Sequence, residues 1–365
     1  MEKARRAEVA FRAVRRPKPP LAACRPQGGA AARGQRGRRT GRSPDQVEGR
    51  LYAALDLGTN NCRLLVARPA AAGFRVIDSF SRIVRLGEGL ATIGRLSDEA
   101  MARTLEALEV CADKIASRMV ASGRYVATEA CRRAANCEEF LANVRERAGL
   151  DIEIISSREE ARLVVAGCSP LLDPRLPYAI VFDIGGGSTE IVWLSLEGRP
   201  RKPLILATLS LPFGVITLTE RFGSAEVAPE TYWSMVEEAK AALAPFECVH
   251  NVRRLVARAS VQMLGSSGTV TTLAGVRMAL PRYIRTRVDG SLLTFNAVAD
   301  VCAHLLALGL GGRAANPCIG RERADLVLSG CAILEAICAT WPVGRLIVAD
   351  RGVREGILYD LMRAS

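Results

Sequence analysis

A duplicated pattern of strand, glycine turn and strand constrains this chain more than any other feature. The first copy comprises an apolar run over residues 51–57, a break at residues 58–61 and a second run over residues 62–67. The second copy begins with the run 178–184, breaks at a triple glycine, and brings Asp183 into the position of Asp56, 127 residues earlier. A weak internal duplication of this kind predicts two related α/β lobes that face each other across a cleft.

Alternating strands and helices fill the space between the two copies. Residues 74–86 predict a strand, and Ser97 predicts a helix start because its side chain can accept from free N–H groups. Further strands are expected at residues 125–128 and 151–155, and helices at residues 138–148 and 157–169. A Pro-containing stretch, residues 170–177, then precedes the second copy. We therefore expect one domain over residues 51–170 and a second over residues 171–351.

The first fifty residues hold most of the net charge of +12, with twelve Arg and two Lys against four acidic residues. They are rich in Arg, Ala, Gly and Pro and lack apolar periodicity, so we predict a disordered tail at residues 1–50. No apolar core follows the basic residues, which argues against a secretory signal. The alternative to a solvated tail is a non-specific contact with nucleic acid or polyphosphate.

The composition of the remaining chain favours a folded cytoplasmic protein. Apolar residues make up 49% of the sequence, which excludes wholesale disorder. The longest uncharged run, residues 259–276, contains three glycines and several hydroxyl residues, so no membrane span is expected. Eleven cysteines without a CxxC pair, together with only two histidines, indicate reduced thiols rather than disulfides or a zinc site.

Both copies of the duplicated pattern place an aspartate at a strand end, directly before glycines and hydroxyl residues. Glycines allow a close backbone approach, and successive N–H groups form a nest for an anion. Asp56 and Asp183 can hold Mg²⁺, which bridges to phosphate oxygens. One such loop alone is more often an ordinary hairpin turn. Two copies in the same register favour phosphate binding.

A third loop, residues 264–269, follows a short strand and precedes a helix expected at about Val270. Free N–H groups at a helix start suit phosphate, although a plain capped helix start explains this loop equally well when it is taken alone. The predicted phosphate-binding residues in the three loops are Gly58, Thr59, Asn60, Gly185, Gly186, Gly187, Ser188, Thr189, Gly265, Ser266, Ser267, Gly268 and Thr269.

Six motifs in this order carry a family resemblance over about residues 51–361. The three loops resemble those of sugar kinases, actin and heat-shock chaperone ATPases, and the full set is more similar to the exopolyphosphatase / guanosine pentaphosphate phosphohydrolase (Ppx/GppA) family. In this sequence the motifs read DLGTNN at 56–61, VATEACRRAAN at 126–136, IEIISSREEAR at 152–162, FDIGGGSTE at 182–190, GSSGT at 265–269 and DRGVREG at 350–356.

Two departures from the family pattern stand out. The first loop reads Gly-Thr-Asn-Asn where many members have Gly-Ser-Asn-Ser, so Asn61 replaces a hydroxyl residue. The sequence ends soon after the closing motif, so we expect the short two-domain form rather than the large form with its long helical C-terminal extension. The resemblance implies a two-lobed actin-like ATPase (ribonuclease H-like) α/β fold, in which the last helix, residues 352–365, completes the first domain.

The resemblance also implies the roles of five charged residues. Glu160 would be the catalytic base that positions water, and Asp183 and Glu190, with Asp56, would hold Mg²⁺. Arg132 would grip phosphate oxygens. Simpler explanations remain for several of these positions, because an acidic pair at 159–160 also compensates the dipole of a helix start, and Glu190 reads as an ordinary polar strand residue. Asn136 can equally cap the next helix, and Arg351 and Arg354 can equally carry surface charge or pair between domains.

The implied activity is a metal-assisted hydrolysis linked to the stringent response. Water would attack directly and release a terminal phosphate from inorganic polyphosphate, or the 5′-γ-phosphate from guanosine pentaphosphate. No Ser, Cys or His is placed convincingly as a covalent nucleophile. The alternatives are a small-molecule kinase of the same fold and a non-catalytic alarmone or polyphosphate sensor. No membrane or specific nucleic-acid partner is expected; a homodimer is compatible with the resemblance, though no sequence pattern demonstrates one.

Overall fold

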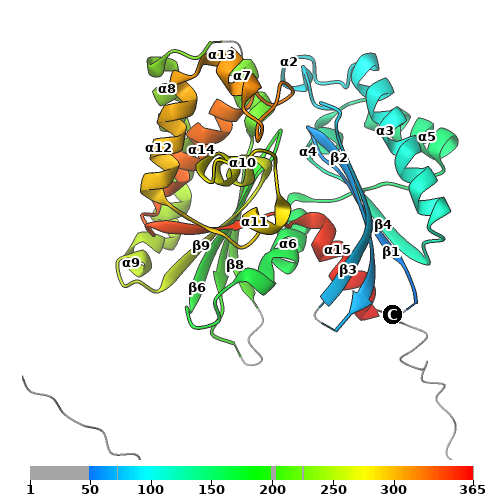
Figure 1. Cartoon of the computed structure of the whole chain (residues 1–365), viewed down its shortest axis with the longest axis horizontal. Helices are drawn as coiled ribbons and strands as arrows, with labels where there is room; N and C mark the ends of the chain where they lie inside the picture. Colours follow the sequence, from blue (N-terminus) through cyan, green and yellow to red (C-terminus); the bar gives the residue numbers. More distant parts are fainter. Residues whose placement is uncertain (1–48, 72, 199–202, 224–225, 365) are drawn as a thin grey trace, which may run out of the picture. The chain divides into compact units, whose positions relative to one another are not determined.

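Two β-sheets organise the chain (Figure 1). The computed structural model describes residues 49–71, 73–198, 203–223 and 226–364, and the predicted tail lies almost entirely outside these ranges. The first sheet has the strand order β3-β2-β1-β4-β5, and the second has the order β10-β11-β9-β6-β7-β8. Their strands are β1 Tyr52–Leu57, β2 Asn61–Ala70, β3 Gly73–Ile83, β4 Ser122–Ala127, β5 Glu153–Ile154, β6 Tyr178–Ile184, β7 Thr189–Ser195, β8 Leu204–Leu211, β9 Val261–Ser266, β10 Leu292–Thr294 and β11 Arg345–Ala349.

The duplication predicted from the sequence is confirmed by the strand pairing. In the first sheet β1 pairs antiparallel with β2 and parallel with β4. In the second sheet β6 pairs antiparallel with β7 and parallel with β9. Asp56 and Asp183 hold the same register position, because each is the last residue but one of its strand. The two aspartates therefore lie at equivalent places in two related sheets.

Helices cover the outer faces of both sheets. Helices α3 and α5 pack together against the first sheet, and helices α8, α12 and α14 pack over the second (Figure 1). The helices are α2 Leu90–Ile93, α3 Asp98–Ser117, α4 Glu129–Arg133, α5 Cys137–Ala148, α6 Ser157–Cys168, α7 Val215–Phe222, α8 Pro229–His250, α9 Val252–Val256, α10 Gly268–Arg277, α11 Arg285–Val288, α12 Phe295–Ala307, α13 Gly309–Ala315, α14 Val327–Thr340 and α15 Val353–Ala364, with a 3₁₀ turn at Ser169–Leu171.

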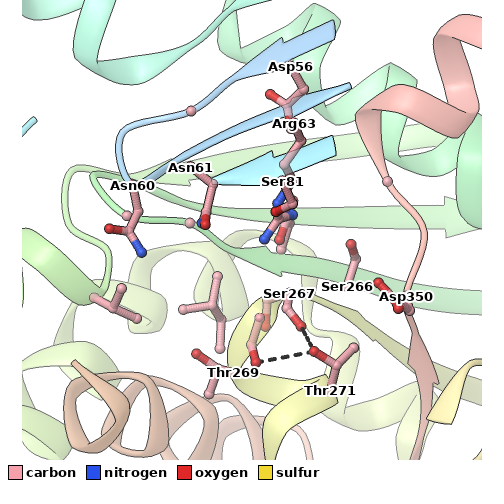
Figure 2. Close-up of a pocket in the computed structure, with 18 of the residues that line it drawn as sticks. Asp56, Asn60, Asn61, Arg63, Ser81, Ser266, Ser267, Thr269, Thr271 and Asp350 are labelled. Carbon is pink, nitrogen blue, oxygen red and sulfur yellow. Dashed lines mark hydrogen bonds between the residues drawn. The ribbon is translucent and has the colours of Figure 1, made fainter. Parts of the chain in front are cut away.

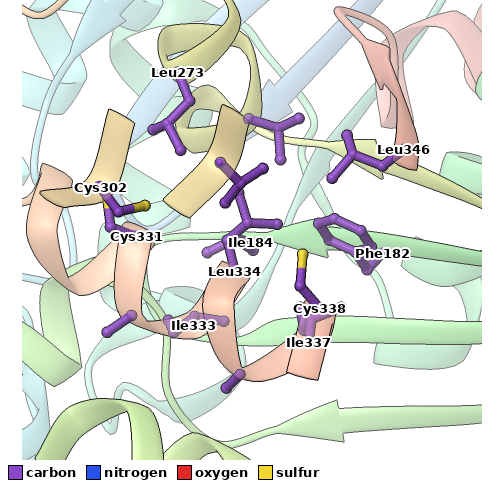
Figure 3. Packing of buried hydrophobic residues seen from close by; sticks show 14 of the residues in the cluster. Phe182, Ile184, Leu273, Cys302, Cys331, Ile333, Leu334, Ile337, Cys338 and Leu346 are labelled. Atoms are coloured by element: carbon purple, nitrogen blue, oxygen red, sulfur yellow. The ribbon is translucent and has the colours of Figure 1, made fainter. Parts of the chain in front are cut away.

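The core of the second sheet is built on the apolar helix α14. Its Ile333, Leu334 and Ile337 are fully buried and belong to one apolar cluster with Phe182 and Ile184 of β6 (Figure 3). A helix that is apolar on nearly every face, as α14 is, has to be buried on all sides. This packing fixes the end of β6, and with it the turn that follows Asp183.

Helices α6 and α15 pack against each other between the two sheets (Figure 1). Two glycines permit this close contact. A Cβ on Gly356 would lie 2.1 Å from the carbonyl oxygen of Leu163, and a Cβ on Gly167 would lie 2.2 Å from that of Gly352. Helix α15 also contacts β1, and its apolar cluster includes residues of both sheets. The expected domain boundaries at residues 170 and 351, and the assignment of residues 352–365 to the first domain, stay predictions.

Local expectations agree with the structure at most element ends. Ser97 caps α3 by accepting from the Ala100 N–H at 3.2 Å. The strand expected at residues 151–155 is reduced to two residues, because β5 lies at the sheet edge and pairs with β4 over two positions. Asn136 precedes α5 without capping it; its side-chain amide instead donates to the Leu96 carbonyl and accepts from the Leu96 N–H.

The ten cysteines in the described ranges are all free thiols, and nine of them are buried. Among these same residues, no single helix is long and apolar enough to cross a bilayer, and α12 with α13 meets that test only as a pair bent by 117°.

Candidate active site

A cavity of about 630 Å³ opens where four strands of the two sheets end. The turns after β1, β6, β9 and β11 all contribute to its walls, and Figure 2 shows Asp56, Asn60 and Arg63 facing the β9–α10 turn across it. Most of the predicted phosphate-binding residues therefore meet in one place. The lining residues among them are Gly58, Thr59, Asn60, Gly185, Gly186, Gly187, Ser188, Ser266, Ser267, Gly268 and Thr269.

Two residues of the predicted loops lie behind the cavity wall instead. The Thr189 hydroxyl donates to the Phe213 carbonyl at 3.0 Å and is fully buried. Gly265 lies on β9 beside Phe182 of the neighbouring strand β6, and a Cβ on it would lie 2.5 Å from the Phe182 ring. Neither residue lines the cavity, and both support the turns whose neighbours do.

The first and second loops touch each other across the cavity. A Cβ on Gly186 would lie 3.0 Å from the Cβ of Thr59, and one on Gly187 would lie 2.9 Å from the Thr59 hydroxyl. Glycine is required here because any side chain would separate the loops. The buried Oδ1 atoms of Asn60 and Asn61 have no hydrogen-bond partner among the described residues. Such unsatisfied acceptors favour a site built to receive a donor or a cation.

The second loop has two backbone N–H groups without an acceptor among the described residues. The Gly185 and Gly186 carbonyls accept from the first N–H groups of α7, at 2.9 and 2.8 Å. The N–H groups of Gly186 and Gly187, by contrast, have no acceptor within the described part of the chain. Free amides in successive glycines are the components of an anion nest.

The third loop contains a capped helix start and also contributes residues to the cavity wall. The Ser267 hydroxyl accepts from the Val270 N–H at 3.1 Å. The Thr271 hydroxyl donates to the Ser267 carbonyl at 2.9 Å (Figure 2). Ser266 donates to the Arg351 carbonyl at 2.6 Å, which ties this loop to the β11–α15 turn. The simple explanation, a cap, therefore accounts for Ser267, while Gly268 and Thr269 are left at the cavity wall.

Four acidic side chains lie at or beside the cavity, where Glu160 and Glu190 are buried and Asp56 and Asp183 are half-buried. Asp56, Glu160 and Asp183 line it, and Glu190 lies just behind. Burial raises the pKa of Asp183 to about 8, with the charge of Glu160 adding to the shift. Burial likewise raises the pKa of Asp56, Glu160 and Glu190. Several carboxylates with raised pKa values in one cleft are typical of a functional site.

Mg²⁺ fits this donor set as a partly hydrated ion. The described residues contain no group of three or more His, Cys, Asp or Glu side chains close enough to enclose a metal. Mg²⁺ usually binds one or two carboxylates and keeps waters and phosphate oxygens in its remaining positions. Glu190 accepts from Ser188 at 2.7 Å and from Ser210 at 3.0 Å, so its carboxylate is already held by two hydroxyls. Asp183 is the acid of this pair that faces the cavity.

Glu160 lies at the start of α6, which Ser156 caps. Glu160 and the adjacent Glu159 have different partners in the structure. Glu159 pairs outside the cavity with Arg162 and Arg124, whose hydrogen bonds lower its pKa to about 2. Glu160 instead points inward and accepts from Arg132 Nη1 at 2.8 Å. Arg132 lies behind Glu160 and does not line the cavity.

Three arginines that line the cavity were not predicted from the sequence. Arg63 lies opposite Asp56 in the β1–β2 register, so the hairpin pattern alone could have found it. Arg285 and Arg323 come from segments without motifs. Burial, with the nearby charge of Arg63, lowers the pKa of Arg323. Two cations forced together in a cavity favour an anionic ligand.

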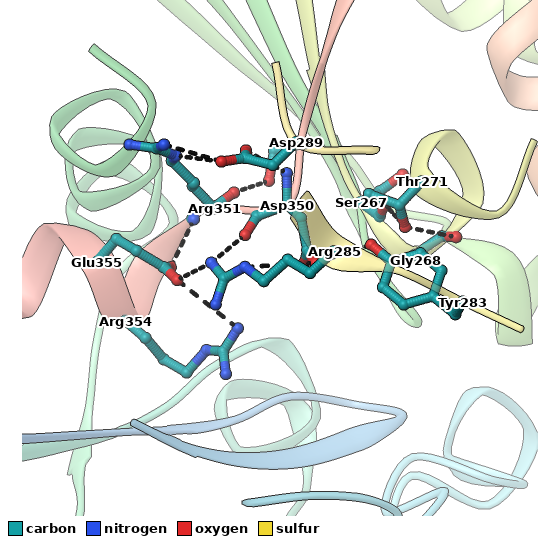
Figure 4. Close-up of polar contacts among 12 residues, drawn as sticks. Ser267, Gly268, Thr271, Tyr283, Arg285, Asp289, Asp350, Arg351, Arg354 and Glu355 are labelled. Atoms are coloured by element: carbon teal, nitrogen blue, oxygen red, sulfur yellow. Dashed lines mark hydrogen bonds and ion pairs between the residues drawn. The ribbon is translucent and has the colours of Figure 1, made fainter. Parts of the chain in front are cut away.

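The arginines of the closing motif belong to an ion-pair network (Figure 4). Arg351 pairs with Asp289 at 2.8 Å, and Arg285 pairs with Glu355 at 2.8 Å. Arg354 lies 4.0 Å from the same glutamate. These arginines therefore form ion pairs, which was one of the two alternatives left open by the sequence. The network holds the start of α15 beside the cavity.

Comparisons with known proteins agree with this architecture. The model of the Ppx/GppA phosphatase family matches residues 65–365. A family member from Aquifex aeolicus shares 28% sequence identity, with 86% of this chain and 98% of that chain covered and a TM-score of 0.71. An exopolyphosphatase from Cytophaga hutchinsonii shares 23% identity with the same coverage and a TM-score of 0.77. The expected actin-like α/β fold is confirmed.

Proposed function

The chain belongs to the Ppx/GppA phosphatase family, and from this premise we propose that it releases terminal orthophosphate from inorganic polyphosphate, from guanosine pentaphosphate, or from both. One observation carries the proposal most directly. Three glycine-containing turns and the inward-facing Glu160 line the same cavity. Phosphoryl transfer depends on positioning and charge stabilisation, and these are the components that such an arrangement supplies.

Each part of the site has a role in direct attack by water. Free amides of the glycine turns and the cations Arg63 and Arg323 hold the phosphate oxygens. Glu160 orients the attacking water by accepting its proton in a hydrogen bond. Asp183 and Glu190 would hold Mg²⁺, which supplies charge neutralisation on the phosphoryl group. A cation beside these acids also favours the ionised form of Glu160, which a water-orienting residue needs.

Positive charge beyond the main cavity supports a polyphosphate chain as substrate. A second cavity of about 430 Å³ adjoins the first and shares Ser81, Ile319 and Arg323 with it. The charged residues that its lining adds are Arg82, Arg321 and Glu322, so with Arg323 its wall carries three arginines against one acid. A chain of phosphates leaving the main cavity would meet these guanidinium groups, each able to contact two oxygens.

Replacement of Glu160 by Gln tests the proposal. Full-length protein with Mg²⁺ is supplied in parallel with long polyphosphate, guanosine pentaphosphate and ATP, and free phosphate is measured. The variant keeps its shape and loses its charge, so we expect kcat to fall by about 10²- to 10⁴-fold. Glu159→Gln, one residue away and outside the cavity, should keep activity within about twofold.

Two results would contradict this function. Absence of phosphate release from every compound, with tight binding retained, would indicate a sensor. Transfer of phosphate to an added acceptor without free phosphate would indicate a kinase.

A further inference from the structure

Glu129 is an acidic residue in the cavity wall that the proposed chemistry does not use. It begins α4 and lines the cavity, with its side chain 16% exposed. An uncompensated carboxylate at this position would repel an anionic substrate. Glu129 is compensated from behind: its Oε2 accepts from Arg132 Nε at 3.1 Å and from Nη2 at 2.9 Å.

The opposite edge of the same guanidinium holds Glu160. Arg132 Nη1 donates to Glu160 Oε2 at 2.8 Å and to the Ile155 carbonyl at 2.8 Å. All three guanidinium nitrogens are therefore engaged, by two carboxylates and one backbone carbonyl. A guanidinium is a rigid plane with donors at fixed angles. Fixing one edge of it on Glu129 consequently fixes the direction of the donor that reaches Glu160.

Glu129 is itself held by packing against the second phosphate loop. A Cβ on Gly187 would lie 3.2 Å from the Cγ of Glu129, so the glutamate stem lies against this loop. The loop, Glu129, Arg132 and Glu160 form a continuous chain of contacts. Turning Arg132 toward the cavity would break four hydrogen bonds that include two charged partners.

We propose that Glu129 is a positioning residue that acts through Arg132 to hold the Glu160 carboxylate in its water-orienting pose. The proposal rests on the phosphohydrolase function, because it assigns Glu160 the role of orienting water. It also assigns Arg132 to Glu160 rather than to the phosphate. A general base displaced by about 1 Å loses much of its effect, since the reacting groups must meet in a narrow range of geometry.

The two assignments of Arg132 predict opposite effects of Glu129→Gln. A positioning role predicts that kcat falls by about tenfold to a hundredfold, while KM stays the same or falls because a negative charge has left the cavity. Phosphate binding by Arg132 predicts a gain, because the arginine is freed from a competing carboxylate. An unchanged or increased kcat would overturn the proposal.

Glu159→Gln is the matched control. Glu159 also pairs with two arginines in the same part of the fold, but it does not line the cavity. Equal losses of kcat in the two variants would show that only general stability was changed and would overturn the proposal. Glu129→Asp retains the charge on a shorter side chain and should recover part of the lost kcat; no recovery above Glu129→Gln would contradict the role of the carboxylate.

Crystal structures of the wild type and of Glu129→Gln give a readout that needs no turnover. We expect the contact between Arg132 Nη1 and Glu160 in the wild type and its loss or lengthening in the variant. An unmoved Arg132–Glu160 contact would overturn the positioning role even if activity falls. A wild type that releases no phosphate would instead refute the proposed function, while the two structures still decide whether Glu129 positions Glu160.

Discussion

Asp183 shows how burial and function oppose each other at single residues. Its carboxyl group lies near Glu160 and Glu190, and its pKa is raised to about 8 by burial first and by the charge of Glu160 second. In the unfolded chain the same group has a pKa near 3.8. The folded protein without a cation therefore retains a proton that the unfolded chain releases in neutral solution.

The first prediction concerns the stability of the metal-free protein as a function of pH. Well below pH 3.8 the aspartate is protonated in both states, and as the pH rises toward 8 the free energy of unfolding falls because the unfolded state gains by ionising. Thermal unfolding should therefore give a lower Tm at about pH 8 than at about pH 6. In Asp183→Asn this fall in Tm should be smaller; an equal fall would contradict the cause assigned to it.

Added Mg²⁺ should reverse the effect. The ion binds the ionised carboxylates of the folded state, and at a free concentration of about 100 times Kd it adds about 2.7 kcal/mol of stability. The gain in Tm should be larger at about pH 8 than at about pH 6 because less proton release is then required. A gain that is independent of pH, or equal in Asp183→Asn, would argue against a metal at these acids.

The local chemistry of residues was predictable, while their long-range partners were not. The phosphate loops could be located because an acid, glycines and hydroxyls follow one another directly in the sequence. The position of Arg63 could have been predicted from the pairing of residues in the β1–β2 hairpin. Arg285 and Arg323 reach the cavity only through the packing of distant segments. The orientation of Arg132 toward Glu160 likewise depends on a contact between residues 28 positions apart.

At the scale of elements, the pair α6 and α15 determines where Glu160 lies. Helix α6 carries Glu160 in its first turn, and α15 packs against α6 through Gly167 and Gly356. Both helices were expected, α6 at residues 157–169 and α15 as the last helix that the resemblance implies. Their mutual approach was not, because a glycine in a helix pattern does not identify the backbone that it faces.

Gly356→Ala tests this positioning. The added methyl group would lie 2.1 Å from the Leu163 carbonyl oxygen, so α15 must move away from α6. We expect a loss of about 1–3 kcal/mol in the free energy of unfolding, with a fall in kcat as α6 shifts. Gly311→Ala is the control, because nothing lies within 4 Å of its added methyl group and alanine favours helix. Chemical denaturation should show destabilisation of the first variant alone; equal behaviour of the two would refute the close-contact argument.

At the scale of the whole described molecule, hydrogen bonds between distant segments link the parts attached to the two sheets. Arg85, after β3, donates to both carboxylate oxygens of Asp325 at 2.9 and 3.0 Å, 240 residues away. The Gly89 N–H donates to Glu220 on α7 at 2.7 Å. These hydrogen bonds join segments attached to different sheets. No motif in the sequence predicts them. The duplicated pattern predicted the two sheets, but it did not predict the hydrogen bonds that link the segments attached to them.

The central claim is that water attacks the phosphorus atom of the terminal phosphate within this cavity. The most direct test is hydrolysis of polyphosphate and guanosine pentaphosphate by the full-length protein with Mg²⁺ in ¹⁸O-labelled water, followed by mass spectrometry of the products. The claim predicts the label in the released orthophosphate and none in the remaining chain or nucleotide, with the reaction lost in Glu160→Gln. Label in the remaining chain or nucleotide, or unlabelled phosphate found only on an acceptor, would contradict it.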